Sequence, residues 1–372
     1  MDVSTAPPYP LHANASNLNV LTEDENATLL RLTAAKEGIF ASSIWLIFFL
    51  GFPGNVACVI TVLSMTTLST ATIYVALLAV VDAVCLVLKL LFHQLAFHDM
   101  YLGNAGCKAT VITSILNCYA NWVLVLVCFE RFLAVRWPLK KAVFFTKSRA
   151  WLIAASLFAV IFLIYVQLFV LYISGPTGHV CGFDAALRAY MRVWYWFAAF
   201  IFTFAPFVLI VVFTTLIITG LRRYRAARKS ILTGDHHHHH HQHNGKGEKR
   251  GDSSNVERAI SVMMSVAAVV FLLLTLPSCI FVISFDPSSW YPPLEYARWM
   301  LFQQVTFVMA DLNHAINFYL YFLTADKFRS RFKDMVMCRR GKLRKKSDAT
   351  SIGDHTMYTR ANSTENLGTT RV

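Results

Sequence analysis

A few ionisable side chains interrupt long apolar stretches of this sequence. Asp82 and Lys89 stand in one such stretch, and Asp311 stands in another. A charge is costly among apolar neighbours, so residues of this kind are by default functional and face a partner or a water-filled cavity. The chemistry that they support is ion pairing and cation binding. The apolar stretches contain no Gly-rich phosphate loop and no pair of metal-ligand residues, so the sequence predicts neither an enzyme nor a metal centre.

The composition excludes a water-soluble globule. The chain has 372 residues, of which 56% are hydrophobic and only 15% are charged, whereas a soluble protein has about 25% charged residues. The 34 Lys and Arg residues exceed the 21 Asp and Glu residues and give a net charge of +13. This charge has to lie on segments that protrude from a bilayer, so we expect a membrane and no nucleic acid as its partner.

Seven stretches are apolar enough to cross a bilayer, for which a helix needs about 20 residues. The predicted spans are Ile39–Leu63, Thr72–Phe97, Ala109–Phe129, Ala150–Ile173, Val193–Leu221, Ala259–Phe285 and Trp299–Leu323. Lys and Arg crowd the segments after the third, fifth and seventh spans, and such an excess marks the cytoplasmic side. The N-terminus is therefore expected outside, and the C-terminus inside, in a plasma-membrane protein that crosses the bilayer repeatedly.

Several local motifs lie on these spans in a recognisable order. They are Gly54-Asn55, Leu78-Ala79-Val80-Val81-Asp82, Glu130-Arg131-Phe132, Pro206, Pro277 and Asn317-Phe318-Tyr319-Leu320-Tyr321. Together they resemble the motifs of the rhodopsin-like (class A) G-protein-coupled receptors. The resemblance implies an all-α membrane protein, a seven-transmembrane helix bundle with a short amphipathic eighth helix and its N-terminus outside. Three residues depart from the family pattern: Phe318 replaces Pro, Thr275 replaces Trp and Thr214 replaces Tyr.

The spans and the resemblance together predict four parts. They are an extracellular glycosylated tail (1–37), the transmembrane bundle (38–325), an amphipathic helix on the inner membrane surface (326–338) and a disordered cytoplasmic tail (339–372). Asn14 and Asn26 each begin a glycosylation sequon in the outer tail. In the third inner loop, His236–His241 is interpreted as a spacer, with a metal-sensing role or an inserted purification tag as alternatives.

The resemblance also assigns roles to individual residues. The expected activation switch consists of Glu130, Arg131, Pro206, Pro277, Asn317 and Tyr321. Arg131 is expected to pair with Glu130 at rest and to release its guanidinium to a partner when the helices move. Cys107 and Cys181 are expected to form a disulfide on the oxidising outer side. Cys338 is expected to carry a palmitoyl group, with an unmodified thiol as the alternative.

Asn55, Asp82 and Asn317 are expected to form a buried polar cluster between the spans. The cluster either holds a sodium ion at Asp82 or is only a hydrogen-bonded network that packs the helices. No other cofactor is expected.

The ligand class follows by exclusion and by resemblance. Asp311 stands where a retinal-binding opsin has its Schiff-base Lys, and Thr113 with Ser114 stands where amine receptors have an Asp. The strings Ser69–Leu78, Glu130–Val135 and Asn313–Tyr319 are similar to invertebrate receptors for FMRFamide-like and myosuppressin-like peptides and to the thyrotropin-releasing-hormone type. We therefore expect a short amidated neuropeptide. A small non-peptide ligand is the alternative, and a channel or transporter would need a continuous polar path.

The expected ligand pocket consists of Lys89, His93, Thr113, Asn117, Arg192, Glu295, Gln303, Gln304 and Asp311. Lys89 lies about two helical turns outward from Asp82, and Asp311 lies outward from Asn317. If Asp82 and Asn317 are neighbours, Lys89 and Asp311 meet as an ion pair. That pair either lies beneath the ligand or has a purely structural role.

Inside the cell, the resemblance implies a heterotrimeric G protein as the main partner. Ser and Thr residues of the tail, once phosphorylated, are expected to dock an arrestin-like protein. The last residues, Thr370-Arg371-Val372, fit a ligand for a PDZ domain.

Overall fold

The computed structural model describes residues 22–65, 69–98, 100, 102–175, 181–234, 248–285 and 291–337. It divides into two compact units, Met1–Ala325 and Asp326–Val372, and each is described by itself. The predictions for Asn14, His236–His241, Cys338 and the tail 339–372 lie outside the described residues.

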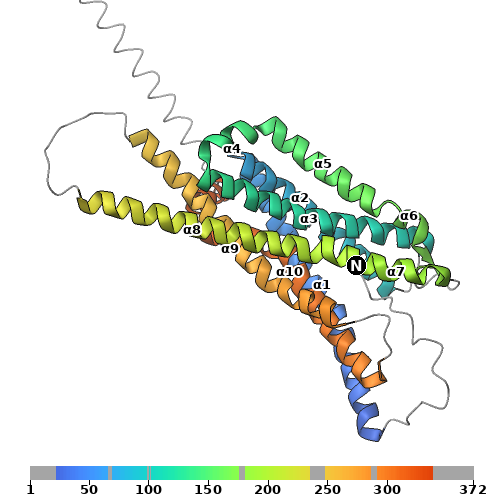
Figure 1. Ribbon diagram of the computed structural model, residues 1–372. Helices are drawn as coiled ribbons and strands as arrows, with labels where there is room; N and C mark the ends of the chain where they lie inside the picture. The colour runs from blue at the N-terminus through green and yellow to red at the C-terminus, as the bar shows by residue number, and fades with distance from the viewer. Residues whose placement is uncertain are drawn as a thin grey trace, which may run out of the picture. The chain divides into compact units, whose positions relative to one another are not determined.

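Long helices form nearly all of the first unit, and Figure 1 shows them packed along one another. They are α1 (Glu23–Leu63), α2 (Thr70–Phe97), α3 (Asn104–Arg136), α5 (Lys147–Tyr165), α7 (Arg188–Ala199), α8 (Ala205–Gly234), α9 (Glu248–Ser284) and α10 (Pro293–Thr324). The short elements are α4 (Pro138–Phe144), α6 (Leu168–Leu171), η3 (Ala185–Leu187), η4 (Phe200–Phe204) and the antiparallel strands β1 (Ile173–Ser174) and β2 (Cys181–Gly182). The predicted all-helical fold is confirmed, with one small hairpin added.

Six helical stretches of the described residues are long and apolar enough to cross a membrane. They are Glu23–Leu63, Thr70–Phe97, Asn104–Arg136, Lys147–Leu171, Arg192–Arg223 and Met264–Ser284. Helix α10 has 32 residues, about 48 Å at 1.5 Å per residue, so its length also suffices for a span. It is less apolar because it carries Gln303, Asp311, His314 and Asn317 among its apolar residues.

The order of packing places α3 at the centre of the bundle. Helix α1 packs against α2 and α10, α2 packs against α3, and α9 packs against α8 and α10. Helix α3 contacts α2, α5, α8 and α9, and its inner residues Glu130 and Arg131 are fully buried. Residues on α2, α3 and α10 therefore face one another across a shared interior.

The distribution of side chains is that of a membrane protein. Large apolar side chains such as Phe49, Leu163 and Leu273 are more than 60% exposed, whereas Asn55 and Asp82 are almost completely buried. Exposed apolar area on this scale marks an interaction surface, and lipid tails cover such a surface around a helix bundle. The predicted multi-pass arrangement is confirmed.

A close approach between α1 and α10 depends on Gly51. A Cβ atom at Gly51 would lie 2.8 Å from the Cα atom of Ala315 and 2.5 Å from Leu86 Cδ1. Ala315, Leu86 and Ile47 form a fully buried apolar cluster at this place. Small residues let helix backbones approach in this way inside membranes, and the contact fixes the rotation of α10 next to His314.

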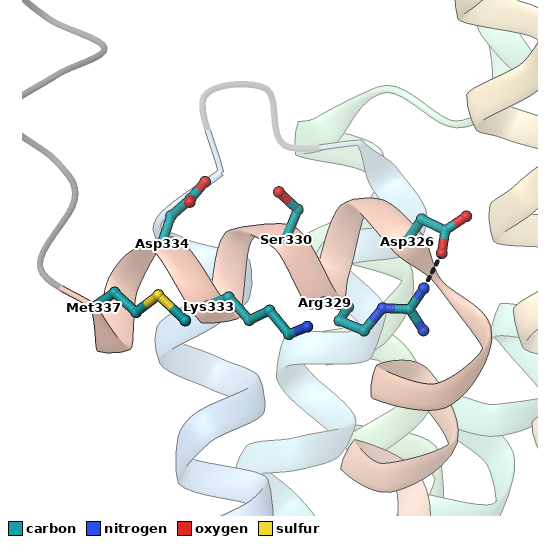
Figure 2. A pocket seen from close by; sticks show the side chains of 6 residues that line it. All are labelled: Asp326, Arg329, Ser330, Lys333, Asp334 and Met337. Atoms are coloured by element: carbon teal, nitrogen blue, oxygen red, sulfur yellow. Dashed lines mark hydrogen bonds and ion pairs between the residues drawn. The ribbon is translucent and has the colours of Figure 1, made fainter.

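In the second unit, α11 (Asp326–Val336) is a short helix with basic and apolar residues. Figure 2 shows a hollow along this helix, lined by Asp326, Arg329, Ser330, Lys333, Asp334 and Met337. Arg329 forms an ion pair with Asp326 across one turn. Such a pair on an exposed surface is worth at most about 1 kcal/mol. The structure is helical over Asp326–Val336, and the place of this helix on the membrane surface stays a prediction.

Candidate functional site

Toward the predicted outer side, Lys89 on α2 and Asp311 on α10 form an ion pair. Their helical positions predicted this pair, and the structure confirms the contact. The two side chains are 18% and 24% exposed. Because the pair is only partly buried, it keeps some hydration, and an incoming cation is able to compete with Lys89 for the carboxylate.

Two predicted pocket residues carry polar atoms without a partner among the described residues. Gln303 on α10 is 4% exposed, and its Nε2 atom makes no hydrogen bond. Asn117 on α3 has a buried Oδ1 atom that accepts none. A buried polar atom without a partner costs about 1–3 kcal/mol. A ligand group that accepts from Gln303, or one that donates to Asn117, would recover that free energy.

His93, another predicted pocket residue, has both ring nitrogens occupied. Its Nε2 lies 3.1 Å from the carbonyl oxygen of Phe40 on α1, and its Nδ1 lies 3.1 Å from Gln94 Nε2. The first contact gives His93 a structural role in joining α2 to α1. The other predicted pocket residues are half-buried or exposed: Thr113, Arg192, Glu295 and Gln304.

Sequence reasoning missed Tyr190 at the start of α7. Its ring stacks on Trp194 with the centroids 6.4 Å apart, and its buried hydroxyl has no partner in the part of the chain that the structure describes. Burial raises the pKa of Tyr190, so its hydroxyl stays neutral near pH 7 and is able to donate to a ligand. No pattern in the sequence separates this Tyr from the neighbouring aromatic residues, since only tertiary packing buries its hydroxyl.

Near the middle of α2, Asp82 is the centre of the buried polar cluster. Its Oδ2 atom accepts a hydrogen bond from Asn317 Nδ2 at 2.9 Å, and its Oδ1 atom lies 2.7 Å from Nδ1 of His314. Asn55 joins through the backbone, because its Nδ2 donates to the carbonyl oxygen of His314 at 2.7 Å. The three predicted residues lie in one cluster, and His314 contacts both Asp82 and Asn55.

A small cavity of about 20 Å³ adjoins Asp82. It is large enough for about one water molecule. Its lining combines Asp82, Asn121, Asn313, His314 and Asn317 with the apolar side chains of Leu78, Ala120, Leu124 and Phe271. The cavity therefore lies between α2, α3, α9 and α10.

Two side chains of α3 hold a wide π turn, η4, in the fifth span. Asn121 Nδ2 donates to the carbonyl oxygen of Phe202 at 3.2 Å, and Trp122 Nε1 donates to that of Ile201 at 3.0 Å. A π turn leaves backbone carbonyls displaced from the regular helical pattern, and such turns often occur at functional sites. Asn121 also lines the cavity next to Asp82, so one residue contacts both features.

At the inner end of α3, Glu130 and Arg131 form the local pair that the resemblance implies. Arg131 Nε donates to Glu130 Oε2 at 2.6 Å, and both side chains are buried. Two further donors were not predicted. Thr70 Oγ1 on α2 donates to Glu130 Oε1 at 2.6 Å, and Lys141 Nζ on α4 lies 3.4 Å from the same oxygen. The guanidinium is therefore held inside, and not presented to a partner.

The remaining switch residues lie where helices bend or meet. Pro206 is in the first turn of α8, directly after the π turn, and Pro277 is inside α9. A proline inside a helix removes a backbone hydrogen bond and favours a kink. Tyr321 on α10 is buried, with 1% of its surface exposed.

On the outer side, Cys107 of α3 forms a disulfide with Cys181 of β2. This confirms the pairing that the resemblance implies. Asn26 lies exposed in the first turn of α1, which begins at Glu23 with Thr22 as its N-cap. Glycosylation of Asn26 stays a prediction.

Comparison with known proteins agrees with this geometry. The chain is 26% identical to the thyrotropin-releasing hormone receptor of Gallus gallus over 82% of its own length and 80% of that receptor. It is 23% identical to a Caenorhabditis elegans protein described as a G-protein coupled receptor, over 86% of its own length and 78% of that protein. The model of the rhodopsin family of seven-transmembrane receptors matches residues 54–321. With the motif residues gathered along α2, α3 and α10 and the family model covering most of the chain, the protein belongs to the rhodopsin family of seven-transmembrane receptors.

Proposed function

We propose that this receptor binds an extracellular neuropeptide, short and amidated in the manner of FMRFamide, and signals through a heterotrimeric G protein. The observation that carries the proposal is the partly exposed ion pair of Lys89 and Asp311. Asp311 offers a carboxylate to a cationic side chain of the peptide. The third span offers no acid between Lys108 and Phe129, so a small amine has no anchor there.

Two further observations support an amidated peptide. A primary amide donates through its NH₂ group and accepts through its carbonyl oxygen. Gln303 Nε2 and Asn117 Oδ1 supply one unused donor and one unused acceptor of the matching kind. In addition, one of the similar proteins is named as the receptor for thyrotropin-releasing hormone.

The first experiment measures second-messenger release from cells that express the chain against a panel of amidated peptides, each paired with its free-acid form. We expect a response to amidated peptides that falls at least tenfold for the free acids, because a lost hydrogen bond to a buried group costs about 1.4 kcal/mol or more. A response to small metabolites together with silence across all peptides would support a receptor for a non-peptide ligand. Ion current without G-protein activation would support a channel.

The second experiment exchanges the charges of the pair in the double variant Lys89→Asp with Asp311→Lys. The exchange keeps an ion pair, so surface expression should be near that of the wild type. Peptide potency should fall at least tenfold, since the carboxylate moves from α10 to α2. Glu37→Gln is the matched control, because Glu37 is an exposed acid on the outer part of α1. Unchanged potency in the double variant would show that the pair is purely structural.

Inside the cell, we propose that phosphorylated Ser and Thr residues of the tail bind an arrestin-like protein and that Thr370-Arg371-Val372 binds a PDZ domain. Phosphorylation adds negative charge to a basic segment and creates a docking site. A free C-terminal carboxylate is captured by strand addition in PDZ domains. Truncation after residue 346 should abolish arrestin recruitment and leave G-protein activation intact.

A further inference from the structure

We propose that the His314 imidazole takes the place at Asp82 that a sodium ion would hold, so that sodium does not modulate this receptor. The family resemblance implies a cation at this aspartate. The residues around Asp82 do not fit one, and the misfit rests on His314. This proposal concerns the interior of the bundle and does not depend on which ligand the receptor binds.

The first argument is the occupancy of the carboxylate. Each oxygen of Asp82 already has a nitrogen partner, His314 Nδ1 at 2.7 Å and Asn317 Nδ2 at 2.9 Å. An ionised carboxylate only accepts hydrogen bonds, so with Asp82 ionised the Nδ1 atom of His314 carries the hydrogen in this contact. Hard cations are bound by oxygen ligands. An N–H group that points at the carboxylate presents positive hydrogen where the cation would have to sit.

The second argument is space. The cavity next to Asp82 measures about 20 Å³, which is room for about one water molecule. Part of its wall is apolar, formed by residues such as Leu78, Leu124 and Phe271. This volume has room for about one water-sized particle, and the apolar part of its wall offers a cation no oxygen ligands.

The third argument is that the imidazole is held in place. His314 is 7% exposed, and its carbonyl oxygen accepts the hydrogen bond from Asn55 at 2.7 Å. The next residue, Ala315, packs against α1 where Gly51 allows no extra atom. Helix α10 therefore cannot rotate at His314 without breaking both contacts, so the Cα atom of His314 stays beside Asp82, and the buried ring keeps its contact with the carboxylate.

The experiment measures thermal unfolding of the purified full-length receptor in NaCl and in choline chloride at equal ionic strength. For the wild type we expect the same midpoint in both salts. His314→Ser removes the ring and supplies a hydroxyl oxygen, so this variant should gain a sodium-specific rise of about 2 °C. The double variant His314→Ser with Asp82→Asn should lose that rise, because the carboxylate is gone.

Two results would overturn the proposal. One is a sodium-specific rise in the wild type that Asp82→Asn abolishes, since sodium would then bind beside the imidazole. The other is a folded His314→Ser variant without a sodium-specific rise, since the imidazole would then not be what excludes the ion. If His314→Ser does not fold, the proposal is tested by comparing the wild type with Asp82→Asn. Equal unfolding midpoints of the wild type in both salts would then support the proposal.

Discussion

At the scale of single residues, Glu130 is the centre of a buried group of charged and polar side chains. Its carboxylate receives donors from three elements: Arg131 on α3, Thr70 on α2 and Lys141 on α4. Charge-assisted hydrogen bonds are worth about 1.5–3 kcal/mol. Because Glu130 is completely buried, the pair is shielded from water and from salt. Thr70 and Lys141 therefore tie this pair to α2 and α4, and the release of Arg131 to a partner stays a prediction.

We predict that Glu130→Gln raises ligand-independent signalling about tenfold. The amide keeps the size of the side chain but loses the charge that holds Arg131, and a loss of about 1.4 kcal/mol shifts a two-state equilibrium by a factor of ten. The measurement is basal second-messenger release at equal surface expression. Thr70→Val removes one neutral donor and should produce a smaller rise, while the exposed control Glu37→Gln should produce none. Basal signalling equal to that of the wild type would argue against Glu130 as the restraint.

At the scale of elements, the contact between α1 and α10 determines which residues of α10 face Asp82. Gly51 brings α1 against Ala315, and His314 and Asn317 then lie on the side of α10 that meets Asp82 on α2. In the fifth span, Asn121 and Trp122 of α3 hold the π turn directly before Pro206. Movement of α8 relative to α3 would have to break or replace those two hydrogen bonds.

We predict that Gly51→Ala lowers the free energy of unfolding by about 1–3 kcal/mol, the usual cost of overpacking. The added Cβ atom would meet the backbone of Ala315, so α1 and α10 would have to separate. Gly38→Ala on the same helix is the matched control, because a Cβ atom there meets nothing within 4 Å. Thermal unfolding of both purified variants checks the prediction. Equal midpoints for the two variants would mean that α1 and α10 separate at Gly51 without a loss of stability.

At the scale of the whole molecule, the bundle exposes large apolar side chains on its outside, and its mostly apolar interior contains a few buried polar residues such as Asn55, Asp82 and Glu130. The disulfide of Cys107 and Cys181 adds a constraint on its outer side, because it closes a loop with a sequence separation of 74 and ties the hairpin to α3. A disulfide of this kind stabilises a protein by about 2–4 kcal/mol.

We predict that Cys107→Ser lowers surface expression and the thermal midpoint, and that a reductant lowers the midpoint of the wild type but not that of the variant. The reason is that the reductant acts on the bond that the variant already lacks. Cys279→Ala is the control, since Cys279 is a buried free thiol on α9 and the variant should stay sensitive to reductant. Wild-type midpoints that are equal with and without reductant would contradict the prediction.

The sequence alone determined the class of fold, and it predicted the inner and outer sides and the motif residues. It could do so because a bilayer demands apolar stretches of a set length and because Lys and Arg collect on one side. It also predicted the pair of Lys89 and Asp311, since both positions follow along their helices from Asp82 and Asn317. Each of these properties can be inferred from the sequence of one helix at a time.

Only the tertiary structure decided which side chains from different helices meet. His314 contacts Asp82, and Thr70 donates a hydrogen bond to Glu130. Asn121 donates a hydrogen bond to the π turn, and the hydroxyl of Tyr190 is buried away from water. Each contact depends on the rotation and depth of two helices, and close packing at places such as Gly51 determines these. Helical periodicity gives the face on which a residue lies and leaves its partner across the interface undetermined.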